Sequence, residues 1–260
     1  MQFKTFQLYI NSDFPKSYDL ANVADHGTTI FFDNVEFYEI EKSILEKRFF
    51  WMYCQYDNSK LYTDTVWNKI TEKEENNPRK KTQIECRNQL FVCYDMQKHL
   101  LYLNDMSKRS FLKKYLHEML NKEVEIKNII HSLEDFERSV QTIKNATFIQ
   151  VRNIANCAPS SIFSQTANIY GLDAPESMQL KVDCGNQPIR KMVNSLRGFK
   201  RRNETGEFER VVVVGVDDSG IEKSFDFSSM IESVKIHAER DENQHFDPNE
   251  VRRLILNEIR

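Results

Sequence analysis

The sequence is poor in glycine, proline and paired cysteines, and each shortage excludes a class of site. Its 260 residues include only seven glycines and six prolines. They form neither a glycine-rich phosphate-binding loop nor a Gly-x-Ser-x-Gly nucleophile elbow, and long flexible linkers are not expected. The five cysteines contain no Cys-x-x-Cys pair, which excludes a zinc ribbon and a thioredoxin-like motif. Scattered thiols of this kind are typical of a reducing cytoplasm.

Long apolar runs and a strong net charge are also missing. No stretch approaches the 18 apolar residues that a membrane-spanning helix requires, and the first residues, MQFKTFQLYINSDF, lack the basic-then-apolar pattern of a signal peptide. We therefore expect a soluble, cytoplasmic protein. The net charge is −3 and the sequence pI is about 6.1, so any polyanion site must be a local patch.

The distribution of elements predicts an α+β fold. Roughly the first hundred residues are rich in β-branched and aromatic side chains and read as strands, with two of them joined across Asp33-Asn34. A polar excursion at about 71–88 reads as a loop. The rest alternates between strands and helices and ends in a hairpin and a helix. We expect a β-rich N-terminal region, 1–105, and an α/β C-terminal region, 106–260, which contains a basic helix.

Helix-capping and turn residues set the expected boundaries in the second half. Ser107 is the expected N-cap of a helix with a buried face, and Ser132 with Asp135 forms a capping signature. The segment 210–228 reads as two strands joined through Asp-Asp-Ser-Gly. Asp247 is the expected cap of the last helix, with Pro248 in its first turn.

The segment IRKMVNSLRGFKRR, residues 189–202, is the strongest functional candidate. It carries six basic side chains and no carboxylate before Glu204. Helical spacing places an apolar stripe on one side: Ile189, Met192, Val193, Leu196 and Phe199. The other side and its flanks carry Arg190, Lys191, Arg197, Lys200 and Arg201, and Arg202 continues into the loop. This face is either a solvated helix surface or a site that holds phosphates.

Further basic clusters could extend such a site if they faced the same groove. They are Lys108, Arg109, Lys113 and Lys114 on the helix near 107; Arg79, Lys80 and Lys81 in the polar excursion; and Arg252 and Arg253 on the last helix. No helix-turn-helix, zinc-finger, zipper or RNP signature accompanies them. We therefore expect contacts to the nucleic-acid backbone without sequence preference.

Catalytic motifs are sparse. His117-Glu118 begins like a zinc-protease helix, but Asn121 stands where the second histidine is required. The six histidines show no metal-binding spacing. Glu125 and Lys127 form a Glu-x-Lys half-motif, for which Asp95 or Asp105 could supply a second carboxylate to Mg²⁺. This nuclease reading stays an alternative, and we assign no catalytic residue, no metal ligand and no cofactor.

Three segments resemble the RexA-like phage-exclusion family of lambdoid prophages and, more loosely, the KwaB component of the Kiwa anti-phage system. They are LFVCYDMQKHLLYLNDMSKRSFLKKYL, NIYGLDAPESMQLKVDCGNQPIRKMVNSL and RVVVVGVDDSGIEKSFDFS, within roughly 89–240. The resemblance implies a cytoplasmic defence factor that binds DNA without sequence preference, as a homodimer, beside a membrane protein encoded alongside. The residues that would carry this function are those of the basic helix and, beyond it, Lys108, Arg109, Lys113 and Lys114.

The sequence therefore predicts a non-enzymatic, sequence-nonspecific DNA-binding protein of a prophage-exclusion or anti-phage system. Two alternatives remain open at this point. One is a Mg²⁺-dependent nuclease that uses Glu125 and Lys127. The other is a protein-interaction module that docks an acidic or membrane-bound partner.

Overall fold

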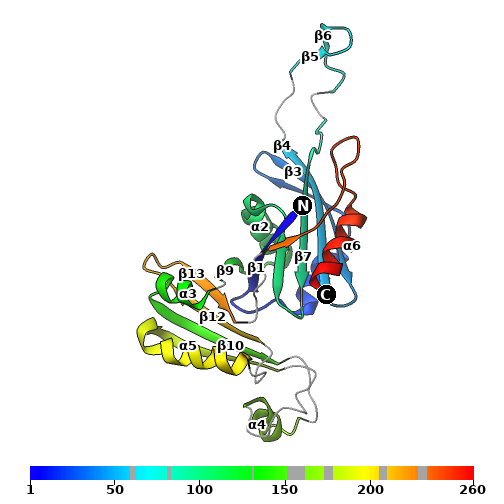
Figure 1. Cartoon of the computed structure of the whole chain (residues 1–260). Coiled ribbons are helices and arrows are strands. Elements are labelled where there is room, and N and C mark those ends of the chain that lie inside the picture. Colours follow the sequence, from blue (N-terminus) through cyan, green and yellow to red (C-terminus); the bar gives the residue numbers. More distant parts are fainter. Residues whose placement is uncertain are drawn as a thin grey trace. The chain divides into compact units, whose positions relative to one another are not determined.

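The computed structural model describes residues 1–58, 63–80, 83–130, 132–150, 162–172, 178–204, 210–227 and 233–260. The fold is α+β with a β-rich N-terminal part, as the sequence predicts (Figure 1). The chain forms two compact units. The first comprises 1–4, 9–125 and 234–260, and the second comprises 5–8 and 126–233. The expected division into 1–105 and 106–260 stays a prediction about domains. The compact units separate after Glu125, and the last helix belongs to the first unit.

The sheet of the first unit has the strand order β1-β8-β7-β4-β3-β2, and β14 pairs with β1. Its strands are β1 (Gln2–Ile10), β2 (Thr29–Asp33), β3 (Glu36–Leu45), β4 (Phe49–Asn58), β7 (Asn88–Asp95), β8 (Leu100–Leu103) and β14 (Ser233–Lys235). The pairs from β2 to β8 are antiparallel. The helices of this unit are α1 (Ser17–Asp25), the 3-10 turn η1 (Met106–Lys108), α2 (Arg109–Leu120) and α6 (Pro248–Ile259).

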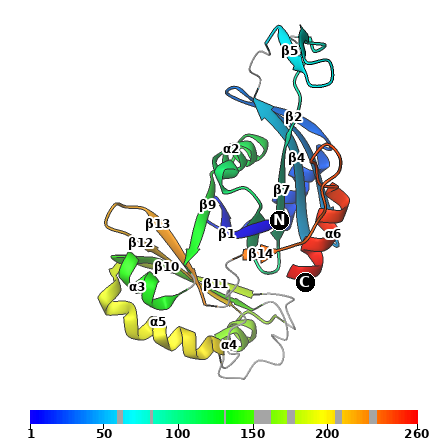
Figure 2. The same cartoon turned by 45° about the horizontal axis from the view of Figure 1, so that its top comes forward.

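Helices cover both faces of this sheet (Figure 2). On one face, Phe111 of α2 stacks on Tyr38 of β3, with ring centroids 3.7 Å apart. Since side chains alternate along a strand, Glu41 and Ser43 of β3 point to the opposite face, where α6 lies. Val251 and Ile255 of α6 are fully buried there.

The sheet of the second unit has the strand order β11-β10-β12-β13-β9. Its strands are β9 (Val124–Ile130), β10 (Thr142–Gln150), β11 (Met178–Pro188), β12 (Arg210–Val216) and β13 (Glu222–Asp226). The pairs are antiparallel except for β13 with β9, which is parallel. The helices are α3 (Leu133–Ser139), α4 (Ile162–Ile169) and α5 (Ile189–Glu204). Phe136 of α3 and Leu196 of α5 share one core with Val213 and Phe225 of the sheet.

Several boundary predictions are confirmed. Asn34 takes a left-handed conformation, φ 56°, between β2 and β3. The Ser132 hydroxyl accepts a hydrogen bond from the Asp135 N–H at 3.3 Å, and Asp247 caps α6 through the Asn249 N–H at 2.9 Å. The two strands expected at 210–228 are β12 and β13.

Three local predictions are corrected. Ser107 is not the cap, because Asp105 accepts its N–H at 2.9 Å and starts η1, and α2 begins at Arg109. The polar excursion contains β6 (Lys73–Asn76), which pairs with β5 (Thr65–Asn68) in a separate sheet of two strands. Helix α1 lies where only strands are expected. Its apolar signal is weak, since Leu20 and Val23 are its only buried apolar side chains.

Candidate nucleic-acid interface

Helix α5 has the two faces that its sequence predicts. It begins at Ile189, directly after Pro188, the last residue of β11. Leu196 is fully buried, and Ile189 is 7% exposed. The other members of the apolar stripe are partly buried and pack against the same core; they are Met192, Val193 and Phe199. This stripe fixes the orientation of the helix, because rotating α5 would expose these side chains to water.

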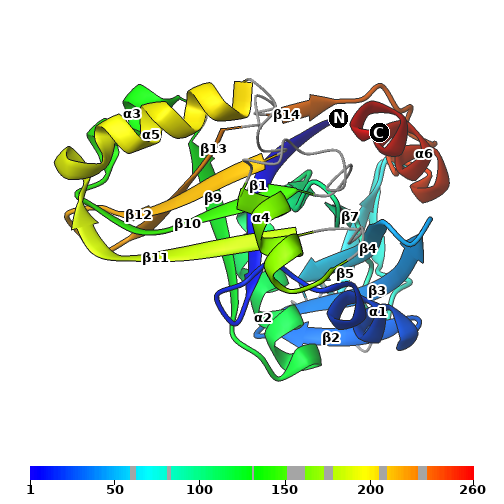
Figure 3. The same ribbon diagram turned by 90° about the horizontal axis from the view of Figure 1, so that it is seen from below.

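The opposite side of α5 is a surface of one sign, which we call the cationic face. It consists of Arg190, Lys191, Arg197, Lys200, Arg201 and Arg202, and all six residues are exposed. Figure 3 shows α5 lying along the outside of the sheet of its unit, with α3 beside it. Long basic side chains on the outer surface of one helix can contact successive phosphates of a nucleic-acid backbone.

Helix α3 brings carboxylates to one part of this surface, which the sequence of α5 alone did not reveal. Arg197 Nη2 lies 3.4 Å from Glu137 Oε2. The pKa of Glu134 lies below its ordinary value, mainly because its own backbone N–H and the Ser132 hydroxyl donate to it, and less because of the charges of Lys200 and Arg197. Arg197 is therefore partly neutralised within the unit. In the described part of the chain, Arg190, Lys191, Lys200 and Arg201 form no ion pair with α3.

The basic cluster of η1 and α2 is largely engaged inside the first unit. Lys108 Nζ donates to both carboxylate oxygens of Glu36, at 2.6 and 2.8 Å, and its side chain is 13% exposed. Lys114 Nζ donates to Asp33 Oδ1 at 2.8 Å. Arg109 is half-buried, and Lys113 is exposed. Lys108 and Lys114 thus satisfy carboxylates of β2 and β3, a use that sequence spacing could not reveal because the partners lie 72 and 81 residues away.

The remaining predicted cations are scattered among the elements. Arg79 forms an ion pair with Glu85, Lys80 is exposed, and Lys81 lies outside the described residues. On α6, Arg253 is exposed, and Arg252 donates to Asn249 Oδ1 at 2.8 Å. Helix α5 belongs to the second unit and these residues belong to the first. The candidate interface is therefore α5 by itself.

The residues of the nuclease alternative make structural contacts. Lys127 is buried and pairs with Glu222 of β13. Asp95 is fully buried and binds Arg48, whereas Asp105 caps η1 and accepts a hydrogen bond from the Tyr56 hydroxyl at 3.2 Å. In the described part of the chain, no three His, Cys, Asp or Glu side chains are grouped so that they could hold a metal ion.

Glu222 carries a testable pH dependence. Burial raises its pKa, but hydrogen bonds and charge from Lys127 and Lys144 outweigh this effect, so its pKa lies below the ordinary value. A lowered folded-state pKa stabilises the fold above the unfolded pKa, about 4.3, and this contribution is lost as the pH falls further. We expect the difference in unfolding free energy between the native chain and Glu222→Gln to shrink on acidification below that pH. Urea unfolding at a series of pH values measures this, and parallel curves would contradict it.

Neither a protein-family model nor a curated protein matches the chain. Among the described residues, no helix is both long and apolar enough to span a membrane.

Proposed function

We propose that this protein binds DNA without sequence preference, holding the phosphate backbone with the cationic face of α5. The observation that carries the proposal is the division of this helix into two faces. A buried apolar stripe anchors it, and six cations project from the exposed side. A helix that only needed solubility would mix both signs of charge along its exposed side. The carboxylates that lie close to Arg197 and Lys200 belong to the neighbouring helix α3 and not to α5 itself.

The resemblance to the RexA-like family extends this proposal to a biological role. The protein would act in the cytoplasm in prophage exclusion or anti-phage defence, together with a membrane protein encoded alongside. As a homodimer it would present two cationic faces, which doubles the number of phosphate contacts and steepens the salt dependence of binding.

The test is fluorescence anisotropy with two duplexes of unrelated sequence over a series of salt concentrations. If all six cations contact phosphates, the slope of log K against log salt should be about −5 for each copy of the chain. Both duplexes should bind with the same affinity, because backbone contacts carry no sequence information. Absence of binding at low salt would refute the proposal and would favour an acidic protein as the partner of α5.

A further inference from the structure

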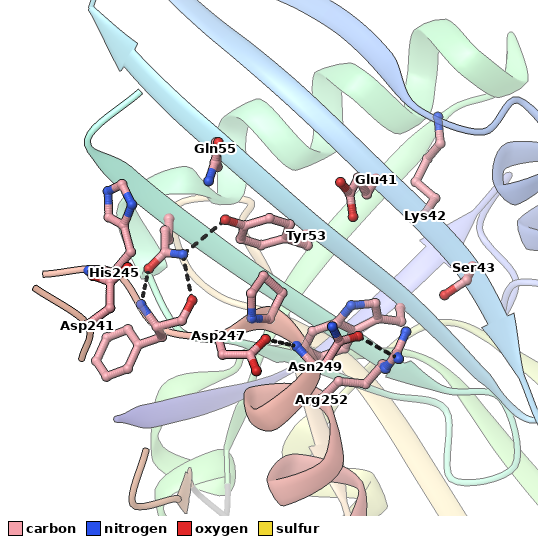
Figure 4. A pocket seen from close by; sticks show the side chains of 14 residues that line it. Glu41, Lys42, Ser43, Tyr53, Gln55, Asp241, His245, Asp247, Asn249 and Arg252 are labelled. Carbon is pink, nitrogen blue, oxygen red and sulfur yellow. Dashed lines mark hydrogen bonds between the residues drawn. The ribbon is translucent and has the colours of Figure 1, made fainter. Parts of the chain in front are cut away.

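A cavity of about 600 Å³ lies within the first unit (Figure 4). One wall is the sheet face of β3, β4 and β7, and the other is the start of α6 with the segment that leads into it. The side chains relevant to its chemistry are Glu41, Trp51, Tyr53, Gln55, Asn249 and Arg252. Its volume is in the range of small-molecule sites, roughly 300–1,000 Å³.

Hydrogen bonds hold the two walls in place. The Gln89 amide donates to the Tyr53 hydroxyl and to the backbone carbonyl of Phe246, both at 2.9 Å, and its oxygen accepts the Phe246 N–H at 2.7 Å. The Asp247 cap fixes the first turn of α6. The cavity is therefore preformed, and a ligand would lose little affinity to ordering it.

Two opposite charges face this cavity without neutralising each other. Figure 4 shows Glu41 on β3 and Arg252 on α6, on opposite walls. In the part of the chain that the structure describes, neither side chain forms an ion pair, although Arg252 donates to Asn249 Oδ1 at 2.8 Å. The neighbouring Lys42 does not compensate Glu41, because its ammonium group donates to Thr29 and Tyr115 on the other face of the sheet.

The other lining groups select among ligand classes. The carboxylates of Asp241 and Asp247 also line the cavity; Asp241 accepts the backbone N–H groups of Asn243 and His245, and Asp247 accepts that of Asn249. Among the described lining residues, the carboxylates of Glu41, Asp241 and Asp247 stand against the one guanidinium of Arg252, which opposes a phosphate ester with its two negative charges. Trp51 and Tyr53 supply an aromatic surface to the lining.

We propose that this cavity binds a small zwitterion of the amino-acid class. Glu41 accepts hydrogen bonds from the ligand's ammonium group, and Arg252 donates to its carboxylate, a charge-assisted pairing that suits the planar guanidinium. The ligand's side chain lies against Trp51 and Tyr53. This proposal concerns the first unit alone and does not depend on DNA binding by α5.

The first experiment measures the thermal unfolding of the full chain with each standard amino acid at millimolar concentration. Isothermal titration calorimetry then gives the affinity of the amino acid with the largest effect. The matched probes are its decarboxylated amine and its N-acetyl derivative, which remove one charge each. We expect each probe to bind about tenfold more weakly than the amino acid, since each lacks one charge-assisted hydrogen-bonded group.

Variants assign each charge to its residue. Glu41→Gln should weaken binding of the amino acid about tenfold but should not further weaken binding of the N-acetyl derivative, which has no ammonium group. Arg252→Gln should likewise weaken binding of the amino acid about tenfold but should not further weaken binding of the amine, which has no carboxylate. Glu39→Gln and Arg253→Gln are the controls, because these neighbours on the same strand and helix do not line the cavity. They should leave the affinity unchanged.

The proposal is overturned if no amino acid raises the unfolding temperature. It is equally overturned if the amine binds as tightly as the amino acid, which would mean a site for simple cations. Unchanged affinity in both Glu41→Gln and Arg252→Gln, with both variants folded as judged by circular dichroism, would also overturn it. None of these results bears on DNA binding, which is measured separately.

Discussion

Replacing Arg190, Lys191, Lys200 and Arg201 together by alanine is expected to abolish most of the salt-dependent affinity for DNA. If each contacts a phosphate, the slope of log K against log salt should lose about 0.9 per residue, or about 3.6 in all. The ratio of the native chain's affinity for DNA to that of the variant should then fall about 100-fold between ~50 and ~200 mM salt. Arg197 is left in place because it pairs with Glu137.

The fold should survive this fourfold change, because all four side chains are exposed and none belongs to the apolar stripe. Alanine also favours the helix. A matched control replaces four exposed cations on other elements, namely Lys47, Lys69, Lys235 and Arg253. Anisotropy titrations of the two variants at equal salt separate a local contact surface from a general effect of net charge. Equal losses in both would refute the assignment to α5.

Asp95→Ala is expected to lower the unfolding free energy by about 3–5 kcal/mol, because it leaves a hydrogen-bonded cation without its partner. Asp95 is fully buried and binds Arg48 in two places, at 3.0 Å to Nε and 2.6 Å to Nη2. It also accepts the backbone N–H groups of Gln97 and Lys98, at 2.9 and 3.1 Å, in the turn between β7 and β8. Removing the carboxylate leaves all these donors unsatisfied at once.

Chemical denaturation of Asp95→Ala measures this loss. Asp218→Ala serves as the control, since Asp218 is exposed in a turn and should change stability by no more than about 0.5 kcal/mol. A loss below about 1 kcal/mol in Asp95→Ala would contradict the structural role of the pair, because typical buried pairs cost more to break.

Local signals account for what sequence reasoning predicted correctly. The apolar residues of α5 recur at helical spacing, so its buried stripe and exposed cations follow from periodicity within one segment. The caps at Ser132 and Asp247 likewise depend on residues two or three positions away. Helix α1 was not predicted because it lacks such a local signal. Its nine residues bury only two apolar side chains, too few to form a helical pattern.

Partners that are distant in the chain account for what sequence reasoning missed. The cluster Lys108, Arg109, Lys113 and Lys114 looks uniform in sequence, yet Lys108 and Lys114 bind Glu36 and Asp33 on strands of the same unit. In the Glu125–Lys127 half-motif, Lys127 pairs with Glu222. No spacing rule connects these residues, since the packing of η1 and α2 against the sheet, and the pairing of β9 with β13, bring them together.

The sequence by itself determined the α+β class, the main strands and helices, and the two-faced character of α5, because each depends on periodicity and capping within a few turns. Only the tertiary structure decided which charges remain available. It placed Glu137 beside Arg197, and among the described residues it left Glu41 and Arg252, which line one cavity, without an ion pair. The physical reason is that a charge is neutralised by whichever opposite charge lies within a few ångströms, and that distance is fixed by the packing of the elements.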